Sequence, residues 1–326
     1  MARRSTPDLG GSFALGARRV HRVGYGAMQL AGDGFSGPPR DHDEALRVLH
    51  AAVAGRVDHI DTAQFYGSGT VNGLIREALH PYPAGLAIVS KVAVGHDTRA
   101  ADLHRGIEDN LRALGLDRLA AVNLRMPDPL AVPDRGFDAQ LASLVKAREQ
   151  GLADGVGLSN ISRQHLLRAL EQTEVVCVQN LFHLLDQRSL DVLEECAQRG
   201  IAFVPYCPLG WPLAARQRIL DSPVLAELGT RLVATPTQVA LAWLLDLAPN
   251  VLLIPGTRTR AHLAENLRAG DVVLDDDARA ALQRSFPPGE RRPTPDPHAL
   301  RPPTGRTRSL GPPESPGSGD AGSPGR

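Results

Sequence analysis

Short apolar runs alternate with amphipathic stretches along most of the chain. Eight runs of five to eight residues are apolar on both faces and are bounded by polar residues, Gly or Pro. They span residues 23–28, 59–63, 87–92, 119–126, 154–160, 175–180, 201–208 and 251–256. Parallel strands that are covered on both faces have this pattern. The pattern therefore predicts eight buried parallel strands.

The stretches between these runs have the spacing of helices. They span residues 41–55, 98–115, 137–151, 162–173, 189–200, 235–248 and 259–270, and a further helix is expected to start near Gly69. Asp41 and Gly115 suit the N-cap of the first helix and the C-terminal end of the second. Eight strands that alternate with helices in 326 residues predict an α/β fold, a single-domain (β/α)8 TIM barrel.

A doubly wound sheet is the competing fold, and it usually carries a GxGxxG turn after its first strand. Residues 24–29 and 155–160 begin with Gly-x-Gly but lack the third glycine, so the barrel is favoured. Before the first strand, residues 12–23 have the pattern of a hairpin centred on Gly16. We expect this hairpin to close the bottom of the barrel.

The two ends of the chain differ from the middle in composition. Residues 287–326 are rich in Pro, Gly, Ser and Arg, and residues 1–12 resemble them. Such segments bury too little apolar surface to offset the entropy lost on ordering. The sequence thus predicts a disordered N-terminus over 1–12, one barrel domain over 13–286 and a disordered tail over 287–326.

Composition narrows the class of protein. Lys and Arg number 36, as do Asp and Glu, so the net charge of zero favours neither nucleic acid nor a membrane surface as partner. The three cysteines are scattered, which fits a reducing cytoplasm. No run reaches the roughly 20 apolar residues of a membrane helix, and no signal peptide is evident. We expect a cytoplasmic protein, monomeric or at most weakly oligomeric, with no metal site, because its 11 histidines form no HxxxH or HExxH pair.

Polar side chains gather where the predicted strands end. They are Asp61, Lys91, Arg125, Ser159, Asn160, Gln179, Asn180, Tyr206 and the turn 255–257, with Tyr66 shortly after the second strand. These ends form the face of a TIM barrel that carries active sites. Each residue alone has a structural alternative, such as a helix cap for Asp61. Together, Asp61, Lys91 and Tyr66 predict an acid–base device in which the ammonium lowers the phenol pKa from its usual value of about 10.

Six segments carry a resemblance to a known family. Residues 59–67, 89–92, 155–160, 178–183, 204–210 and 254–267 resemble, in this order, the signature segments of the aldo-keto reductases. The resemblance spans residues 20–285 and implies a (β/α)8 barrel that binds NADPH, with NADH as the second option, without a Rossmann fold. It also implies hydride transfer to a small carbonyl substrate, with Tyr66 as proton donor and Asp61 and Lys91 as its partners.

The resemblance also implies a set of residues that contact the cofactor. They are Gly26, Ala27, Met28, Asp61, Ser159, Asn160, Gln179, Tyr206, Pro208, Leu209, Gly210, Pro255, Gly256, Thr257, Arg258, His262, Glu265 and Asn266. Tyr206 would stack on the nicotinamide, and Arg258 would clamp the 2′-phosphate. The alternative for Arg258 and Arg260 is a solvated helix start. Residues 209–232 either connect two elements or fold over the cofactor, with Trp211 at the mouth.

Arg125 departs from the family pattern. In residues 123–129, with sequence NLRMPDP, it takes the position of the family's catalytic histidine. A fixed cation there would donate to the substrate oxygen and stabilise a developing oxyanion. The structural alternative is an ion pair with Asp128 or another carboxylate.

Three functions follow from these observations. The first is an NADPH-dependent oxidoreductase that reduces aldehydes or ketones to alcohols. The second is a catalytically weak nicotinamide-binding regulatory or subunit protein on the same barrel. The third is an unrelated barrel enzyme, for instance a phosphate-binding isomerase.

Overall fold

The computed structural model describes residues 6–95 and 98–289, and its centre is one parallel sheet. Its strands, in spatial order, are β3 (Tyr25–Gly26), β4 (His59–Asp61), β5 (Ala87–Ala93), β6 (Ala121–Arg125), β7 (Val156–Ser159), β8 (Cys177–Leu181) and β9 (Ala202–Tyr206). Every strand pairs with the next one along the chain. A doubly wound sheet reverses its strand order, so that alternative is wrong.

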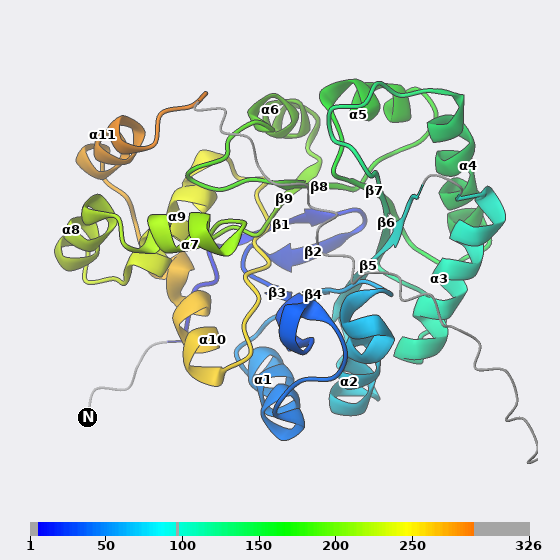
Figure 1. Cartoon of the computed structure of the whole chain (residues 1–326), viewed down its shortest axis with the longest axis horizontal. Helices are drawn as coiled ribbons and strands as arrows, with labels where there is room; N and C mark the ends of the chain where they lie inside the picture. The colour runs from blue at the N-terminus through cyan, green and yellow to red at the C-terminus, as the bar shows by residue number, and fades with distance from the viewer. Residues whose placement is uncertain (1–5, 96–97, 290–326) are drawn as a thin grey trace, which may run out of the picture.

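The eighth predicted strand joins the two edges of this sheet without forming a continuous ladder. Val251 bridges Phe203 of β9, and Leu253 bridges Val23 just before β3, both in parallel orientation. The Gly24 amide donates to the Leu253 carbonyl at 2.9 Å. These contacts close the sheet into the barrel that the sequence predicts, with the helices outside it (Figure 1).

Helices cover the outside of the barrel. They are α1 (His42–Ala54), α2 (Thr70–Leu79), α3 (Ala100–Leu114), α4 (Arg135–Glu149), α5 (Arg163–Leu170), α6 (Leu190–Arg199), α9 (Pro236–Leu247) and α10 (Arg260–Leu267). The caps behave as expected, because the Asp41 side chain accepts from the Glu44 amide at 2.8 Å and Gly115 ends α3 at a φ of 65°. Each of these helices matches a predicted one to within a few residues.

Additional helical segments were not predicted. They are α7 (Leu213–Leu220), α8 (Pro223–Arg231), α11 (Asp276–Ser285) and the 3-10 turns η1 (Ala27–Leu30), η2 (Asp33–Phe35) and η3 (Tyr66–Gly69). The 3-10 turn η4 (Arg268–Asp271) instead forms the end of the helix predicted over 259–270. The helices α7 and α8 occupy the connection 209–232, which therefore has a packed structure of its own.

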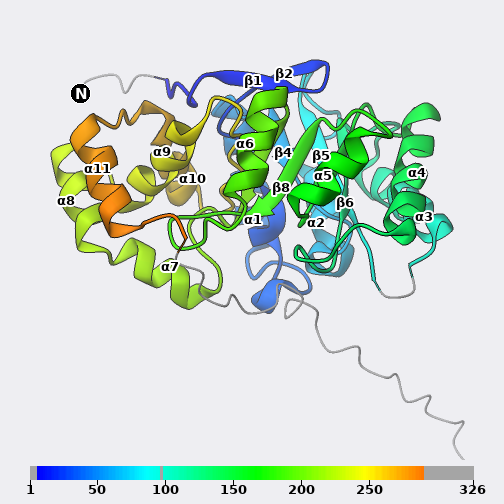
Figure 2. The same cartoon turned by 90° about the horizontal axis from the view of Figure 1, so that it is seen from above.

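The predicted hairpin is confirmed and lies across one end of the barrel. It comprises β1 (Ser12–Leu15) and β2 (Arg18–His21), which pair antiparallel around Gly16 at a φ of 61°. Leu15 and Val20 are buried in a cluster with Ala87 and Ala202, which begin β5 and β9. The hairpin therefore seals the amino ends of the strands (Figure 2).

Residues 6–12 pack against the barrel, so the expected disorder of residues 1–12 does not extend to them. Leu9 is fully buried, and its carbonyl accepts from the Val23 amide at 3.1 Å. The Asp8 amide donates to Asp271 Oδ1 at 2.8 Å. A single apolar residue among polar and Gly neighbours has no periodicity, which is why the sequence pattern missed it. The tail from 290 onward and residues 1–5 lie outside the described residues.

We expect Leu9→Ala to lower the free energy of unfolding by about 2–5 kcal/mol, because it leaves a cavity at a fully buried position. Chemical denaturation measures this change. Leu213→Ala is the matched control, since Leu213 is 71% exposed and should change stability by less than about 0.5 kcal/mol. Equal effects of the two substitutions would show that the N-terminal segment does not pack.

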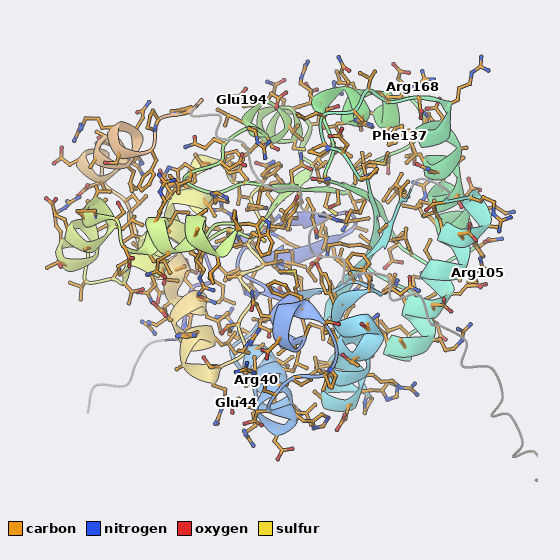
Figure 3. The ribbon with its side chains drawn as sticks, viewed as in Figure 1. Arg40, Glu44, Arg105, Phe137, Arg168 and Glu194 are labelled. Atoms are coloured by element: carbon orange, nitrogen blue, oxygen red, sulfur yellow. The ribbon has the colours of Figure 1, made fainter. Side chains whose placement is uncertain are left out.

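The helices carry charged side chains on the outside of the molecule and apolar side chains on the side that faces the core. Figure 3 shows Arg105, Arg168 and Glu194 at the periphery, on α3, α5 and α6. Phe137 on α4 is instead buried in the core. None of the helices within 6–95 and 98–289 is long and apolar enough to cross a lipid bilayer.

Candidate active site

A buried ion pair lies at the carboxyl ends of β4 and β5. Lys91 Nζ donates to Asp61 Oδ1 and, at 2.9 Å, to the Thr62 carbonyl. Gln179 Nε2, from β8, donates to Asp61 Oδ2 at 2.5 Å. Both ionised side chains are almost fully buried, where unpaired charges would be very costly. The structure thus brings together three predicted site residues, and the charges of Asp61 and Lys91 cancel.

Tyr66 reaches this pair from η3, directly after β4. Its ring centre lies 5.1 Å from Lys91 Nζ. Burial raises the pKa of Tyr66, although Lys91 and Arg125 act in the opposite direction. The Lys91 ammonium lowers the phenol pKa as expected, but the burial of Tyr66 outweighs it, so the expected net lowering of this pKa is not found. The physical reason is that burial penalises the phenolate, and the nearby Asp61 carboxylate adds to that penalty.

A polar network behind the ion pair was missed by sequence reasoning. Thr62 Oγ1 donates to Asn72 Oδ1 at 2.7 Å, and Asn72 Nδ2 donates to Asn110 Oδ1 at 3.0 Å. Ser90 Oγ, next to Lys91, also donates to Asn110 Oδ1, at 2.5 Å. The network ties β4 and β5 to α2 and α3. An asparagine on the buried face of each helix was the available signal.

Arg125 is the last residue of β6 and lies in the mouth of the barrel, which is the opening at the carboxyl ends of the parallel strands. Its Nη1 donates to Ser159 Oγ at 3.1 Å, and its Cζ lies 5.0 Å from the centre of the Tyr206 ring. No carboxylate of the described residues forms an ion pair with it, and Asp128 instead accepts from the Leu130 amide at 2.8 Å. The structural alternative of an Arg125–Asp128 pair is therefore wrong.

The predicted nicotinamide contacts are gathered beside Arg125. Asn160, at a left-handed φ of 58°, accepts from the Tyr206 hydroxyl at 3.0 Å and donates to the Met126 carbonyl at 2.9 Å. Gln179 Oε1 is buried and has no hydrogen-bond partner among the described residues. A buried acceptor of this kind fits an amide NH2 group, because leaving it unpaired is costly.

The backbones of Gly26 and Gly256 are in close contact next to the position where residues 251–254 close the barrel. A Cβ at Gly26 would lie 2.4 Å from the Ile254 carbonyl oxygen, and one at Gly256 would lie 2.6 Å from the Gly26 carbonyl oxygen. Backbone packing alone therefore requires both glycines. The Tyr25 hydroxyl donates to the Thr257 carbonyl at 2.6 Å and fixes the same turn, a role that the sequence did not indicate.

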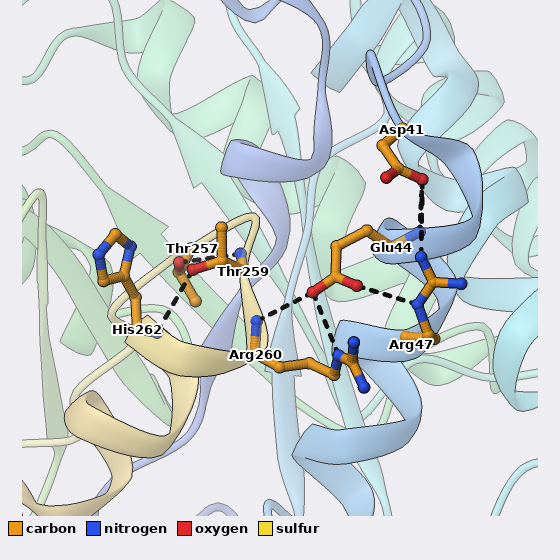
Figure 4. A network of polar contacts seen from close by, with 7 residues as sticks. All are labelled: Asp41, Glu44, Arg47, Thr257, Thr259, Arg260 and His262. Atoms are coloured by element: carbon orange, nitrogen blue, oxygen red, sulfur yellow. Dashed lines mark hydrogen bonds and ion pairs between the residues drawn. The ribbon is translucent and has the colours of Figure 1, made fainter.

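The two arginines at the start of α10 differ in their partners. Arg260 donates through both its amide and its Nε to Glu44 Oε1 at 3.2 Å, and Arg47 Nε binds Glu44 Oε2 at 2.9 Å (Figure 4). These arginines lower the pKa of Glu44 to about 2. Arg258 is exposed and makes one long contact, 3.4 Å to Gln29 Oε1. It is therefore the better placed of the two to receive an external anion.

The remaining predicted cofactor residues lie in η1, in the segment after β9, before the turn at Gly256 and on α10. Ala27 and Met28 begin η1; Pro208, Leu209 and Gly210 follow β9; Pro255 precedes the Gly256 turn; His262, Glu265 and Asn266 lie on α10. Glu265 Oε1 accepts from Thr235 Oγ1 at 2.5 Å, so its carboxylate is already engaged with the start of α9.

Trp211 packs against the loop that follows β3. Its ring centre lies 5.8 Å from that of Phe35 in η2. This contact joins the connection after β9 to the loop after β3. In the described part of the chain, no three His, Cys, Asp or Glu side chains converge in a way that could hold a metal ion.

The chain is similar in sequence and structure to known oxidoreductases. The sequence model of the Aldo/keto reductase family matches residues 22–285. Pyridoxine 4-dehydrogenase of Escherichia coli is 43% identical over 281 residues, which cover 83% of this chain and 96% of that protein. An uncharacterized oxidoreductase of Schizosaccharomyces pombe is 34% identical over 280 residues, which cover 83% of this chain and 89% of that protein. The structure of an aldo/keto reductase from Klebsiella pneumoniae in complex with NADP and acetate superposes with a TM-score of 0.74 at 25% identity, covering 87% of this chain and 98% of that one.

Proposed function

The chain belongs to the aldo/keto reductase family, and from this premise we propose that it reduces aldehyde or ketone carbonyls to alcohols with NADPH, using Tyr66 as the proton donor. Membership of the family makes it an oxidoreductase and rules out an unrelated isomerase on the same fold. The observation that carries the proposal is the buried Asp61–Lys91 pair directly beside the Tyr66 ring.

The residues at the mouth fit a nicotinamide dinucleotide. Gln179 Oε1 is an unpaired buried acceptor for a carboxamide NH2, Tyr206 offers a ring face, and Arg258 offers an available cation for a phosphate. Structures of aldo/keto reductases from Klebsiella pneumoniae in complex with NADP and with NADPH support the same choice. When bound, the cofactor supplies the hydride that reduces the carbonyl carbon.

The protein's own groups supply the proton and stabilise the charge that develops on oxygen. Burial keeps Tyr66 protonated at neutral pH, so it can donate to the carbonyl oxygen. Lys91, held by Asp61 and the Thr62 carbonyl, favours the phenolate that donation leaves behind. Arg125 adds a fixed cation on the same side of the mouth, where it stabilises the oxyanion.

Turnover of an aldehyde panel tests this proposal. Pyridoxal belongs in the panel because the 43% identical relative is a pyridoxine 4-dehydrogenase. The loss of NADPH absorbance is followed for each aldehyde, with NADH in parallel. Cofactor binding without turnover on any member would favour the second candidate, a nicotinamide-binding subunit protein in which the catalytic histidine has been replaced.

We expect Arg258→Ala to weaken NADPH binding by about 1.5–3 kcal/mol, which is the loss of one charge-assisted contact, and to leave NADH binding nearly unchanged. Fluorescence titration with both cofactors measures this difference. Arg260→Ala is the matched control, because Arg260 is already paired with Glu44 and should affect both cofactors little. Equal losses of NADPH and NADH affinity in Arg258→Ala would show that Arg258 does not contact the 2′-phosphate.

A further inference from the structure

Arg125 brings an uncompensated positive charge to the mouth. Asp61 and Lys91 neutralise each other, and the described residues offer Arg125 no ion pair. Asp186, whose charge reaches Tyr206, is itself paired with Arg188 at 2.8 Å. Burial raises the pKa of Tyr66, Tyr206 and Cys207, so all three are neutral at pH 7. The groups around Tyr66 and Tyr206 therefore carry one net positive charge, that of Arg125.

Two of the contacts that Arg125 makes involve residues that are also proposed to contact the nicotinamide. Its guanidinium covers the Tyr206 ring and binds Ser159 Oγ. A nicotinamide that stacked on the Tyr206 face covered by Arg125 would displace the guanidinium from it, and the reduced ring is neutral and would add no counter-charge. The guanidinium then has a planar fork of N–H donors that lacks an acceptor, in a partly buried site.

From this charge balance we infer that Arg125 selects carbonyl substrates that carry an ionised oxygen beside the carbonyl group, as in an ortho-hydroxy aromatic aldehyde. The fork of a guanidinium matches two neighbouring oxygens, one from the carbonyl and one from the phenolate. Histidine presents a single N–H toward a substrate and is not a permanent cation, so it does not provide this recognition. The inference rests on the proposed function, because it concerns the substrate of that reaction.

Three aldehydes of similar size test the inference. They are 2-hydroxybenzaldehyde, its methyl ether 2-methoxybenzaldehyde, and 4-hydroxybenzaldehyde, whose phenolate is remote from the carbonyl. We expect kcat/KM for the 2-hydroxy compound to exceed that for the methyl ether by about 10- to 100-fold, mainly through KM. A 4-hydroxy compound reduced as well as the 2-hydroxy compound would overturn the inference, since its charge is not adjacent to the carbonyl.

Variants at Arg125 test whether this side chain causes the preference for 2-hydroxybenzaldehyde over its methyl ether. Arg125→Met keeps the length and removes the charge, so the ratio between the 2-hydroxy and 2-methoxy compounds should fall to within about threefold. Arg125→Lys keeps the charge without the fork and should retain part of the ratio. A ratio that persists in Arg125→Met overturns the inference. NADPH binding, followed by fluorescence, confirms that each variant is folded.

A spectroscopic measurement separates this inference from the proposed reaction. The phenolate of 2-hydroxybenzaldehyde absorbs at longer wavelength than its neutral form, and with NADP+ no hydride is available. Binding to the wild-type protein with NADP+ should increase the phenolate band at a pH where the free compound is mainly neutral, and Arg125→Met should abolish the increase. Absence of the band in the wild type overturns the inference even if aldehydes are turned over. If the phenolate band appears but no aldehyde is turned over with NADPH, the proposed reaction is rejected and the inference about Arg125 still stands.

Discussion

Replacing Tyr66 with phenylalanine is expected to abolish carbonyl reduction while NADPH affinity stays close to wild type. The substitution removes the phenolic proton and leaves the ring that lies 5.1 Å from Lys91 Nζ. A positioned general acid contributes about 100- to 10,000-fold to a rate, so turnover should fall at least into this range. Steady-state rates and fluorescence titration with NADPH measure the two effects separately.

The control for this experiment is Phe65→Leu, next to Tyr66. Phe65 is 45% exposed and packs edge-on against the Tyr66 ring, so it changes the surroundings of the phenol without removing the proton. Its rate should stay within about tenfold of wild type, since it contributes packing rather than chemistry. A Tyr66→Phe variant with wild-type turnover would show that another group protonates the substrate oxygen.

Arg125→Ala is expected to reduce turnover by about 2–4 kcal/mol of transition-state stabilisation, the scale of one oxyanion donor. NADPH affinity should change little. Measuring kcat/KM and the melting temperature of the same variant separates a catalytic role of the side chain from a purely structural one. An Arg125→Ala variant with intact turnover and a lower melting temperature would mean that the guanidinium only packs on Tyr206 and Ser159.

Arg125→His rebuilds the arrangement usual in the family and should retain or raise activity on uncharged aldehydes. The pH profile separates the two side chains. Arginine stays charged, so the wild-type rate should be flat between about pH 5 and 8. An imidazole is cationic only below its usual pKa of about 6.5, so the rate of the histidine variant should fall as pH rises through this value. The raised pKa of Tyr66 keeps the proton donor intact over the whole range.

Much of the fold could be predicted because local patterns and global packing agree. The eight apolar runs mark the barrel, and caps such as Asp41 and Gly115 lie where the helices begin and end. The strand ends that supply Asp61, Lys91 and Arg125 were also predictable, since parallel strands bring their carboxyl ends to one face. The candidate cofactor residues were proposed from the resemblance to a family, because no periodicity marks them.

Other features depend on distant contacts that a linear pattern does not contain. Leu9 is buried where the segment before β1 contacts Val23, in the loop between β2 and β3, and where the adjacent Asp8 contacts Asp271 at the end of η4. The direction of the Tyr66 pKa shift depends on the balance between burial and three charges, which requires coordinates. Arg260 pairs with Glu44, which lies 216 positions away in the sequence, whereas Arg258 does not. The sequence alone therefore could not show which of the two arginines is available for an anion.

The way in which the barrel closes has a consequence for its local stability. The β5–β6 ladder has five registered pairs, whereas residues 251–254 hold the two edges together through isolated bridges. Partial opening at this position breaks fewer hydrogen bonds than separation of β5 from β6, so the amides of Gly24 and Leu253 should be less protected in hydrogen exchange than those of the β5–β6 ladder. Gly26 and Gly256 continue directly from the two sides of this junction. A dinucleotide that contacts both sides binds only the closed form, and by mass action it stabilises the closed barrel.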